Sequence, residues 1–260
     1  MKVQDLTDAL LEYMPDADVD IILNAYIYSA KAHRGQSRRS GEAYISHPLE
    51  VANNLVKLKL DATTVAAGLL HDTIEDTLST PEEIKELFGE EIFQLVDGVT
   101  KISQIHFSSH EESQAENYRK MIFAMARDIR VVLIKLADRA HNMQTLESLS
   151  EERQRRIARE TLEIYAPIAN RLGIGWMKTE LENGSFRYLY PEEYRTIEEK
   201  VAKGKEYRDQ YVEKVTSRLV KELGEAEIPG KVAGRPKQFF SIYKKMMDQN
   251  ISFEDVYDLV

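Results

Sequence analysis

Apolar residues recur every three or four positions along most of the chain up to about Leu223. The spacing is clearest from Ile21 to Ala32, Val51 to Leu60, Val65 to Leu70 and Ile129 to Ala137. This period places apolar side chains on one face of a helix. The pattern therefore predicts that packed helices form most of the chain.

Capping and turn residues mark where helices begin and where they are interrupted. Pro48 suits the first turn of a helix, and Ser79 to Glu83 combines a hydroxyl cap, a proline and two acids. Between two predicted helices, Gly35 to Tyr44 is a polar loop rich in arginine and serine. Such a loop either binds phosphate or is a solvated connector, and its pattern alone leaves both interpretations open.

The pattern changes after Pro191. Residues 191–223 carry mixed charge and few large apolar residues, which predicts a helical connector with one buried stripe. Residues 228–232 fit the start of a strand, residues 239–247 are helical again, and residues 255–260 alternate like a strand. Because an isolated strand needs partners, we expect the chain to stop within an α/β domain. The expected organisation is a domain at 1–190, a linker at 191–224 and the start of a second domain at 225–260.

Composition and charge exclude several classes of protein. The 260 residues are 43% hydrophobic and 30% charged, and no apolar run is long enough to span a membrane. The N-terminus lacks the layout of a signal peptide, and the absence of cysteine excludes disulfides and thiolate metal sites. We therefore expect a cytoplasmic protein. A net charge of −9 gives no global basic footprint for nucleic acid. Local clusters suit a phosphate-rich small molecule, and they contain Lys31, Arg34, Arg38, Arg39, Lys135 and Arg139.

Histidine and aspartate residues on separate predicted helices offer a metal site. His47 heads one helix, His71 and Asp72 lie toward the end of the next, and Asp138 lies where a later apolar helix ends in polar residues. Two imidazoles and two carboxylates suit Mn, Fe or Zn better than Ca or Mg, which prefer oxygen ligands alone. The sequence therefore predicts a mixed nitrogen and oxygen metal site.

Two more acids, Glu75 and Asp76, follow one turn after the His-Asp pair. On a continuous helix they would share the face of that pair, where they could orient an attacking water or move its proton. A plainer interpretation is that lone histidines pack, acidic pairs face solvent, and Asp138 pairs with Arg139. The order of the residues favours the metal site. A His, a His-Asp pair one helix later and an Asp on a later apolar helix form the signature of the HD phosphohydrolase superfamily.

Longer motifs extend this pattern over nearly the whole chain. They resemble RelA/SpoT homologues, the bacterial (p)ppGpp synthetase/hydrolases. The matching segments are Ala32 to Gln36, Ser40 to Glu42, Tyr44 to Pro48, Leu70 to Asp76, Asp97 to Lys101, Ile134 to Arg139, Asn142 to Met143, Tyr165 to Gly173 and Gly234 to Lys237.

The resemblance implies an all-α HD-domain helical bundle, followed by a helical linker and the truncated start of an α/β nucleotidyltransferase-like synthetase domain. The implied activity is Mn²⁺-dependent hydrolysis of the 3′-pyrophosphate of (p)ppGpp, giving GDP or GTP and pyrophosphate. The implied metal ligands are His47, His71, Asp72 and Asp138, and the implied catalytic acids are Glu75 and Asp76. Contacts to the substrate are implied for Arg38, Arg39, Ser40, Lys135, Arg139, Asn142 and Thr145.

Only the beginning of a synthetase site is implied near the end of the chain. Its residues are Arg235, Lys237, Ser241 and Lys244 for phosphate and Asp258 for metal. We therefore expect no (p)ppGpp synthesis by this chain. We also expect no membrane and no direct nucleic-acid partner, with any ribosome contact made through further domains.

The chain departs from the family pattern at Ala43, where proline is usual, and at Gln144, where arginine is common. We expect these changes to alter loop rigidity or surface charge and to leave the chemistry intact. His106 and His110 are expected to be surface residues. Two alternatives to the implied activity remain, an HD phosphohydrolase acting on another nucleotide and a nucleotide-sensing module without turnover. The intact acid pair makes the sensor the weaker of the two.

Overall fold

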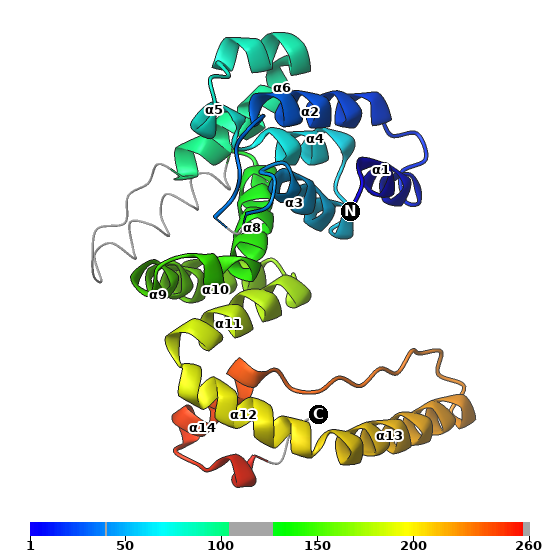
Figure 1. Cartoon of the computed structure of the whole chain (residues 1–260). Helices are drawn as coiled ribbons and strands as arrows, with labels where there is room; N and C mark the ends of the chain where they lie inside the picture. Colours follow the sequence, from blue (N-terminus) through cyan, green and yellow to red (C-terminus); the bar gives the residue numbers. More distant parts are fainter. Residues whose placement is uncertain (40, 104–126, 257–260) are drawn as a thin grey trace. The chain divides into compact units, whose positions relative to one another are not determined.

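The computed structural model describes residues 1–39, 41–103 and 127–256, which form two compact units, Met1–Leu181 and Glu182–Val260 (Figure 1). The boundary between the units falls inside one helix. The described part of the first unit contains α1 (Val3–Leu11), α2 (Val19–Ala32), α3 (Ser46–Lys57), α4 (Ala62–Leu70), α5 (Thr73–Asp76), α6 (Pro81–Ser103), α8 (Ile129–Gln144), η1 (Leu146–Ser148), α9 (Glu151–Glu160), η2 (Thr161–Tyr165), α10 (Ala166–Arg171) and the start of α11 (Gly175–Leu189).

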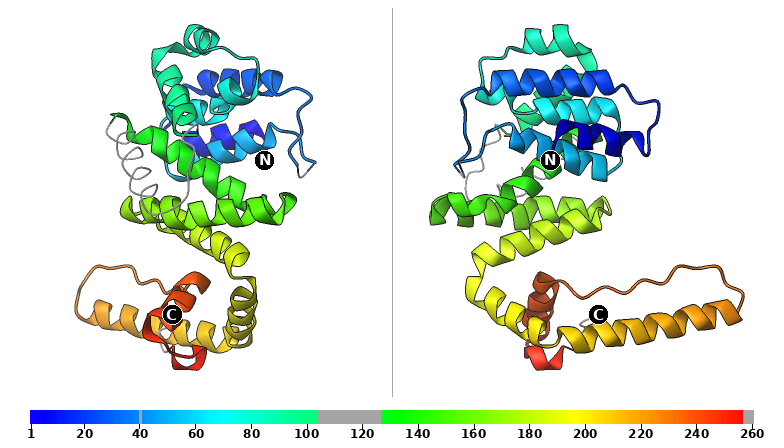
Figure 2. Two further views of the ribbon diagram at one scale, coloured as in Figure 1. Left: turned by 90° about the vertical axis from the view of Figure 1, so that its left-hand side faces the viewer. Right: turned by 45° about the vertical axis from the view of Figure 1, so that its right-hand side comes forward.

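Helix α4 is the centre of the first unit. Asp61 caps its first turn by accepting a hydrogen bond from the Thr64 amide at 2.7 Å. Every residue of the helix except Thr63 is buried, and the helix packs against α2, α3, α6 and α8 (Figures 1 and 2). Gly68 lets α3 approach closely, since a Cβ atom there would collide with the side chain of Leu55. A helix that is apolar all round is stable only when surrounded, which fixes its place in the core.

The end of α4 differs from the predicted continuous helix. The helix stops at Leu70, His71 and Asp72 form a turn, and the short helix α5 begins at Thr73. The Thr73 hydroxyl donates to the Leu70 carbonyl at 2.6 Å and thereby satisfies a backbone group at the break. A helical turn is nevertheless kept from Asp72 onward, since the Asp76 amide donates to the Asp72 carbonyl at 2.8 Å, so Asp76 follows Asp72 by one turn as expected.

Helix α8 and the loop after α2 complete the surroundings of the site. Asp138 lies in the interior of α8, which continues to Gln144, so the helix does not end near Asp138 as expected. The segment between α2 and α3 is a loop, as predicted, with one antiparallel bridge between Ser37 and Ala43. His106 and His110 lie outside the described residues.

The second unit has its own small core. After the end of α11 it contains α12 (Pro191–Lys203), α13 (Lys205–Glu225), α14 (Phe239–Gln249) and the short turn η3 (Phe253–Asp255). Phe186, Ile197, Ile242 and Val256 form its buried apolar cluster, with tyrosines and phenylalanines of α12 and α14 packed against it. Helix α12 is thus a packed element of this unit rather than only part of a connector.

The strand predicted at residues 228–232 is not formed. These residues have no regular secondary structure, and no strand pairs with them in the described part of the chain, although a strand needs such a partner. Asp255 lies in the turn η3 instead of a strand, and residues 257–260 lie outside the described residues. The start of an α/β synthetase domain therefore stays a prediction, as do the functional domain boundaries.

Helices dominate the described residues, which confirms the predicted fold class for the main part of the chain. Among the helices described, none combines the length and the apolar character that crossing a membrane requires. The buried polar residues of the first unit include His47, His71 and Asp138.

Candidate metal centre

Three helices bring the predicted metal ligands together. His47 is the second residue of α3, His71 and Asp72 follow α4, and Asp138 projects from α8. The Nε2 atom of His47 lies 3.4 Å from Oδ2 of Asp72 and 3.3 Å from Oδ1 of Asp138. The Nε2 atom of His71 lies 3.0 Å from Oδ1 of Asp72 and 3.8 Å from Oδ1 of Asp138. Four side chains from distant parts of the sequence thus converge.

The donor atoms fit a divalent metal ion. The Nδ1 atom of His71 lies 2.8 Å from the Gly68 carbonyl, which can only accept, so Nδ1 carries the proton and Nε2 keeps its lone pair in the neutral ring. This buried Nε2 atom is surrounded by carboxylate oxygens, which only accept, so in the neutral ring its lone pair has no donor. Ligand atoms of His47, His71 and Asp138 all lie within 4.8 Å of one another. An ion shared by these atoms would satisfy the orphaned nitrogen.

Buried charges set the electrostatics of this cluster. Burial alone would raise the pKa of Asp138, but the Lys135 ammonium, 2.7 Å from Oδ2, holds that pKa well below its usual range. Burial would lower the pKa of His71, yet the negative charges of Asp72 and Asp138 raise it to about 10. Without a metal, the cluster therefore retains a proton on His71 at neutral pH, and a bound cation would replace that proton.

Asp76 is tied to the metal cluster through Tyr44. The phenol oxygen of Tyr44 lies 2.5 Å from Oδ2 of Asp76 and 2.9 Å from Oδ2 of Asp72. Burial and the charge of Asp72 raise the pKa of Tyr44 far above its usual value, so the phenol remains a donor. The ring of His33 stacks on Tyr44 at a centroid distance of 4.2 Å. Tyr44 therefore joins a metal-side carboxylate to one of the predicted catalytic acids.

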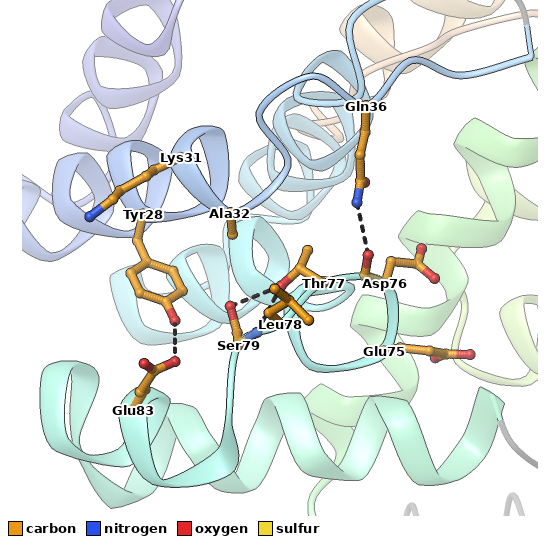
Figure 3. A pocket seen from close by; sticks show the side chains of 10 residues that line it. All are labelled: Tyr28, Lys31, Ala32, Gln36, Glu75, Asp76, Thr77, Leu78, Ser79 and Glu83. Carbon is orange, nitrogen blue, oxygen red and sulfur yellow. Dashed lines mark hydrogen bonds between the residues drawn. The ribbon is translucent and has the colours of Figure 1, made fainter.

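Glu75 borders an open cavity of about 830 Å³, whose lining includes Asp76 but none of the four predicted metal ligands. Figure 3 shows Glu75 and Asp76 on one side of this cavity, with Tyr28 and Lys31 of α2 on the other. Partial burial raises the pKa of Glu75, and the nearby carboxylates of Asp72 and Asp76 raise it further against the opposing charge of Lys135. A carboxyl group with a raised pKa beside a cavity suits proton transfer.

Arg38 anchors the polar loop at residues 35–44, the Arg/Ser loop, on α8. Its Nη2 atom donates to Oδ1 of Asn142 at 2.6 Å, and its Nη1 atom lies 3.0 Å from Nδ1 of His141 and 3.1 Å from Nδ1 of His47. Asn142 in turn donates from Nδ2 to Oδ1 of Asp138 at 2.5 Å. A single guanidinium thus connects the loop with residues that border the cluster.

A family model described as an HD domain matches residues 25–175, which include all the residues of this cluster. This chain belongs to the HD-domain family. The match covers more than half of the chain and extends through the described helices α3, α4 and α8.

Curated relatives are similar to nearly the whole chain of this HD-domain protein. A GTP pyrophosphokinase of Myxococcus xanthus is 57% identical over 96% of the chain and 33% of its own length. The bifunctional (p)ppGpp synthase/hydrolase SpoT of Escherichia coli K12 is 48% identical over 98% of the chain and 36% of its length. A probable guanosine-3′,5′-bis(diphosphate) 3′-pyrophosphohydrolase of Synechocystis is 50% identical over 92% of the chain and 32% of its length. The chain thus spans about a third of these relatives.

Two predicted substrate cations of the HD domain have partners within the protein. Lys135 binds Asp138, and the Nη2 atom of Arg139 donates to Oε1 of Glu160 at 2.9 Å. The Arg139 guanidinium also lies over the ring of Tyr165 at 4.3 Å, where the π-helical turn η2 places that ring. The structure gives both cations a supporting role in α8, and their contact with substrate stays a prediction.

The remaining predicted residues lie in several places. Arg39 is exposed on the Arg/Ser loop, Ser40 lies outside the described residues, and Thr145 caps the end of α8 one turn after Asn142. Ala43 takes part in the bridge with Ser37, and Gln144 is the exposed last residue of α8. The predicted synthetase residues Arg235 and Lys237 lie between α13 and α14, and Ser241 and Lys244 lie in α14. The predicted metal aspartate, Asp258, lies outside the described residues.

Tyr44 and His141 were missed as site residues by sequence reasoning. His141 is one turn after Asp138 on α8, so helical periodicity alone could have placed it on the same face. Burial lowers the pKa of His141 to about 3, and the charges of His47 and Arg38 lower it in the same direction. Tyr44 comes one turn before His47, but its reach to Asp76 depends on the packing of the loop against α5.

Proposed function

We propose that this HD domain hydrolyses the 3′-pyrophosphate of (p)ppGpp to GDP or GTP and pyrophosphate, with Mn²⁺ as its metal. The observation that carries the proposal is the buried cluster whose orphaned His71 nitrogen faces carboxylate oxygens. The substrate is inferred from the relatives, two of which are named for (p)ppGpp hydrolysis and match more than nine tenths of the chain. The mixed nitrogen and oxygen donor set supports Mn²⁺ over Mg²⁺ or Ca²⁺.

We assign His47, His71, Asp72 and Asp138 as the residues that hold the ion. A divalent ion there would lower the pKa of water and polarise a phosphoryl oxygen. Lys135 and Asn142 orient Asp138 through hydrogen bonds to its two oxygens. The Gly68 carbonyl fixes the tautomer of His71.

The acids beside the cluster handle protons and position water in this proposal. Glu75, with its raised pKa and its place beside the cavity, moves the proton of the attacking water. Asp76 orients that water while Tyr44 fixes its carboxylate. The fork of Arg38 suits phosphate oxygens, so the substrate would replace part of its contacts with α8. Asn142 and Thr145 then lie next to the nucleoside.

Chromatography of ppGpp, GTP, dNTPs and cyclic dinucleotides after incubation with the chain and Mn²⁺ tests the proposal. We expect pyrophosphate and GDP from ppGpp, and intact GTP. Glu75→Gln should retain Mn²⁺ and lose most turnover, whereas Glu86→Gln, an equivalent change at an exposed position of α6, should leave turnover unchanged. Unchanged ppGpp with the Mn²⁺-loaded protein would contradict the proposed reaction.

The same assay separates the alternatives. Hydrolysis of another nucleotide in place of ppGpp would identify an HD phosphohydrolase of different specificity. Tight binding of ppGpp that remains intact after long incubation would identify a sensing module. Incubation with ATP and GDP should give no ppGpp, and any product would contradict our expectation that this chain has no synthetase activity.

A further inference from the structure

The two histidines of the cluster are oriented in different ways. The Nδ1 proton of His71 is accepted by a backbone carbonyl, which has no other protonation state. The corresponding nitrogen of His47 faces a side chain instead, because Nδ1 of His141 lies only 2.8 Å away. The rings of His47 and His141 are buried, at 1% and 6% exposure, so water does not replace the contact between them.

Only one of the two facing nitrogens, Nδ1 of His47 and Nδ1 of His141, can carry a proton in this contact. Two ring nitrogens at 2.8 Å share one proton, so one ring donates and the other accepts. Nη1 of Arg38 can only donate, and it lies 3.0 Å from Nδ1 of His141 and 3.1 Å from Nδ1 of His47, so it supports whichever ring accepts. The metal site decides between the two: if His141 accepts, Arg38 and His47 share the lone pair of its Nδ1 atom, and Nε2 of His47 keeps its own lone pair toward Asp72 and Asp138. If His47 accepts, its Nε2 atom bears the proton and cannot bind a metal.

We propose that His141 is a positioning residue that accepts the Nδ1 proton of His47 and so holds His47 in its metal-binding tautomer. The inference deepens the proposed function, since it rests on the same metal site, but it does not depend on the substrate. His141 also accepts from Arg38, so one nitrogen links a metal ligand with the Arg/Ser loop.

A matched pair of variants tests the acceptor role. His141→Asn keeps an oxygen near the position of Nδ1, and His141→Leu has similar size without an acceptor. The free Mn²⁺ signal in electron paramagnetic resonance measures affinity on the metal-free protein without any substrate. We expect His141→Leu to weaken Mn²⁺ binding about 10–100-fold, as the loss of a partner of a metal ligand commonly does, and His141→Asn to recover most of it. Saturating Mn²⁺ should restore kcat in His141→Leu, while the loosened Arg38 should leave KM raised.

Equal Mn²⁺ affinity in His141→Leu and the unaltered chain would overturn the proposal, and so would an equal loss in both variants. If His141→Leu does not fold, long-range ¹⁵N–¹H spectra of the unaltered chain loaded with diamagnetic Zn²⁺ decide the question. We expect a proton on Nδ1 of His47 and on Nε2 of His141. A proton on Nδ1 of His141 would overturn the proposal. If the unaltered chain binds Mn²⁺ as expected but does not hydrolyse ppGpp, the proposed function is contradicted and the role of His141 in metal binding stands.

Discussion

Asp138 offers the sharpest test of the cluster because it is a proposed metal ligand that also pairs with a buried cation. Its side chain is 5% exposed and that of Lys135 is 11% exposed, with 2.7 Å between Nζ and Oδ2. Asp138→Asn removes the negative charge from this pair. Breaking a buried pair costs about 3–5 kcal/mol, because the remaining charge stays desolvated. For a unit of this size, roughly 2–4 °C of Tm per kcal/mol predicts a loss of roughly 6–20 °C.

Metal adds a second, separable effect. Mn²⁺ at a hundredfold excess over its Kd should stabilise the unaltered chain by about 2.7 kcal/mol, because it binds only the folded state. Asp138→Asn should lose this increment in addition to its loss without metal. The double variant Asp138→Asn with Lys135→Met should recover much of the metal-free stability, since it removes the buried cation, and should still lose the Mn²⁺ increment.

Chemical denaturation followed by the fluorescence of Trp176 measures both effects, because this single tryptophan lies in the first unit. Asp8→Asn, at an exposed position of α1, is the matched control and should change stability little. A metal-free loss below about 1 kcal/mol in Asp138→Asn would refute the buried-pair argument. A full Mn²⁺ increment in this variant would refute the assignment of Asp138 as a ligand.

Three further predictions follow from the same structure. Tyr44→Phe should lower turnover about 10–100-fold while leaving the fold intact, since the change removes the phenol's hydrogen bonds to Asp76 and Asp72. Steady-state kinetics measures the turnover and circular dichroism the fold, and an unchanged kcat/KM would count against the role of Tyr44. Because the pKa of His71 is about 10 without metal, Mn²⁺ must displace the His71 proton below that pH, so the affinity for Mn²⁺ should rise with pH between about 6 and 9. Calorimetric titration in buffers of different ionisation enthalpy should detect the released proton. Binding without proton release would contradict this protonation state. Gly68→Ala should destabilise the first unit by about 1–3 kcal/mol through the collision with Leu55; an unchanged denaturation midpoint would show that α3 and α4 adjust freely.

The sequence predicted the helices well where a long apolar period covers one element. Helices α2, α3 and α8 begin or end near the expected residues because their patterns extend over several turns. The hydrophobic pattern predicted the wrong local structure where tertiary contacts decide the backbone conformation. The chain turns at His71 although the local sequence suits a helix, and residues 228–232 form no strand because no described strand pairs with them.

The sequence also predicted only part of the site. His47, His71, Asp72 and Asp138 were selected by type and order, and the structure brings them together, while their ligand role stays a prediction. Lys135 and Arg139 were selected as cations, but sequence could not foresee that Asp138 and Glu160 bind them. Charge is visible in a sequence, whereas the partner of a charge depends on which helices pack together.

By itself, the sequence determined that the main part of the chain is helical and which residue types could hold a metal, because periodicity and side-chain chemistry are local properties. Only the tertiary structure decided which atoms meet. His141 contacts His47 across 94 residues, and Tyr44 reaches Asp72 across 28, because α3, α4 and α8 pack around one core. A hydrogen bond needs its two atoms within about 3 Å, and that precision comes from packing and not from spacing along the chain.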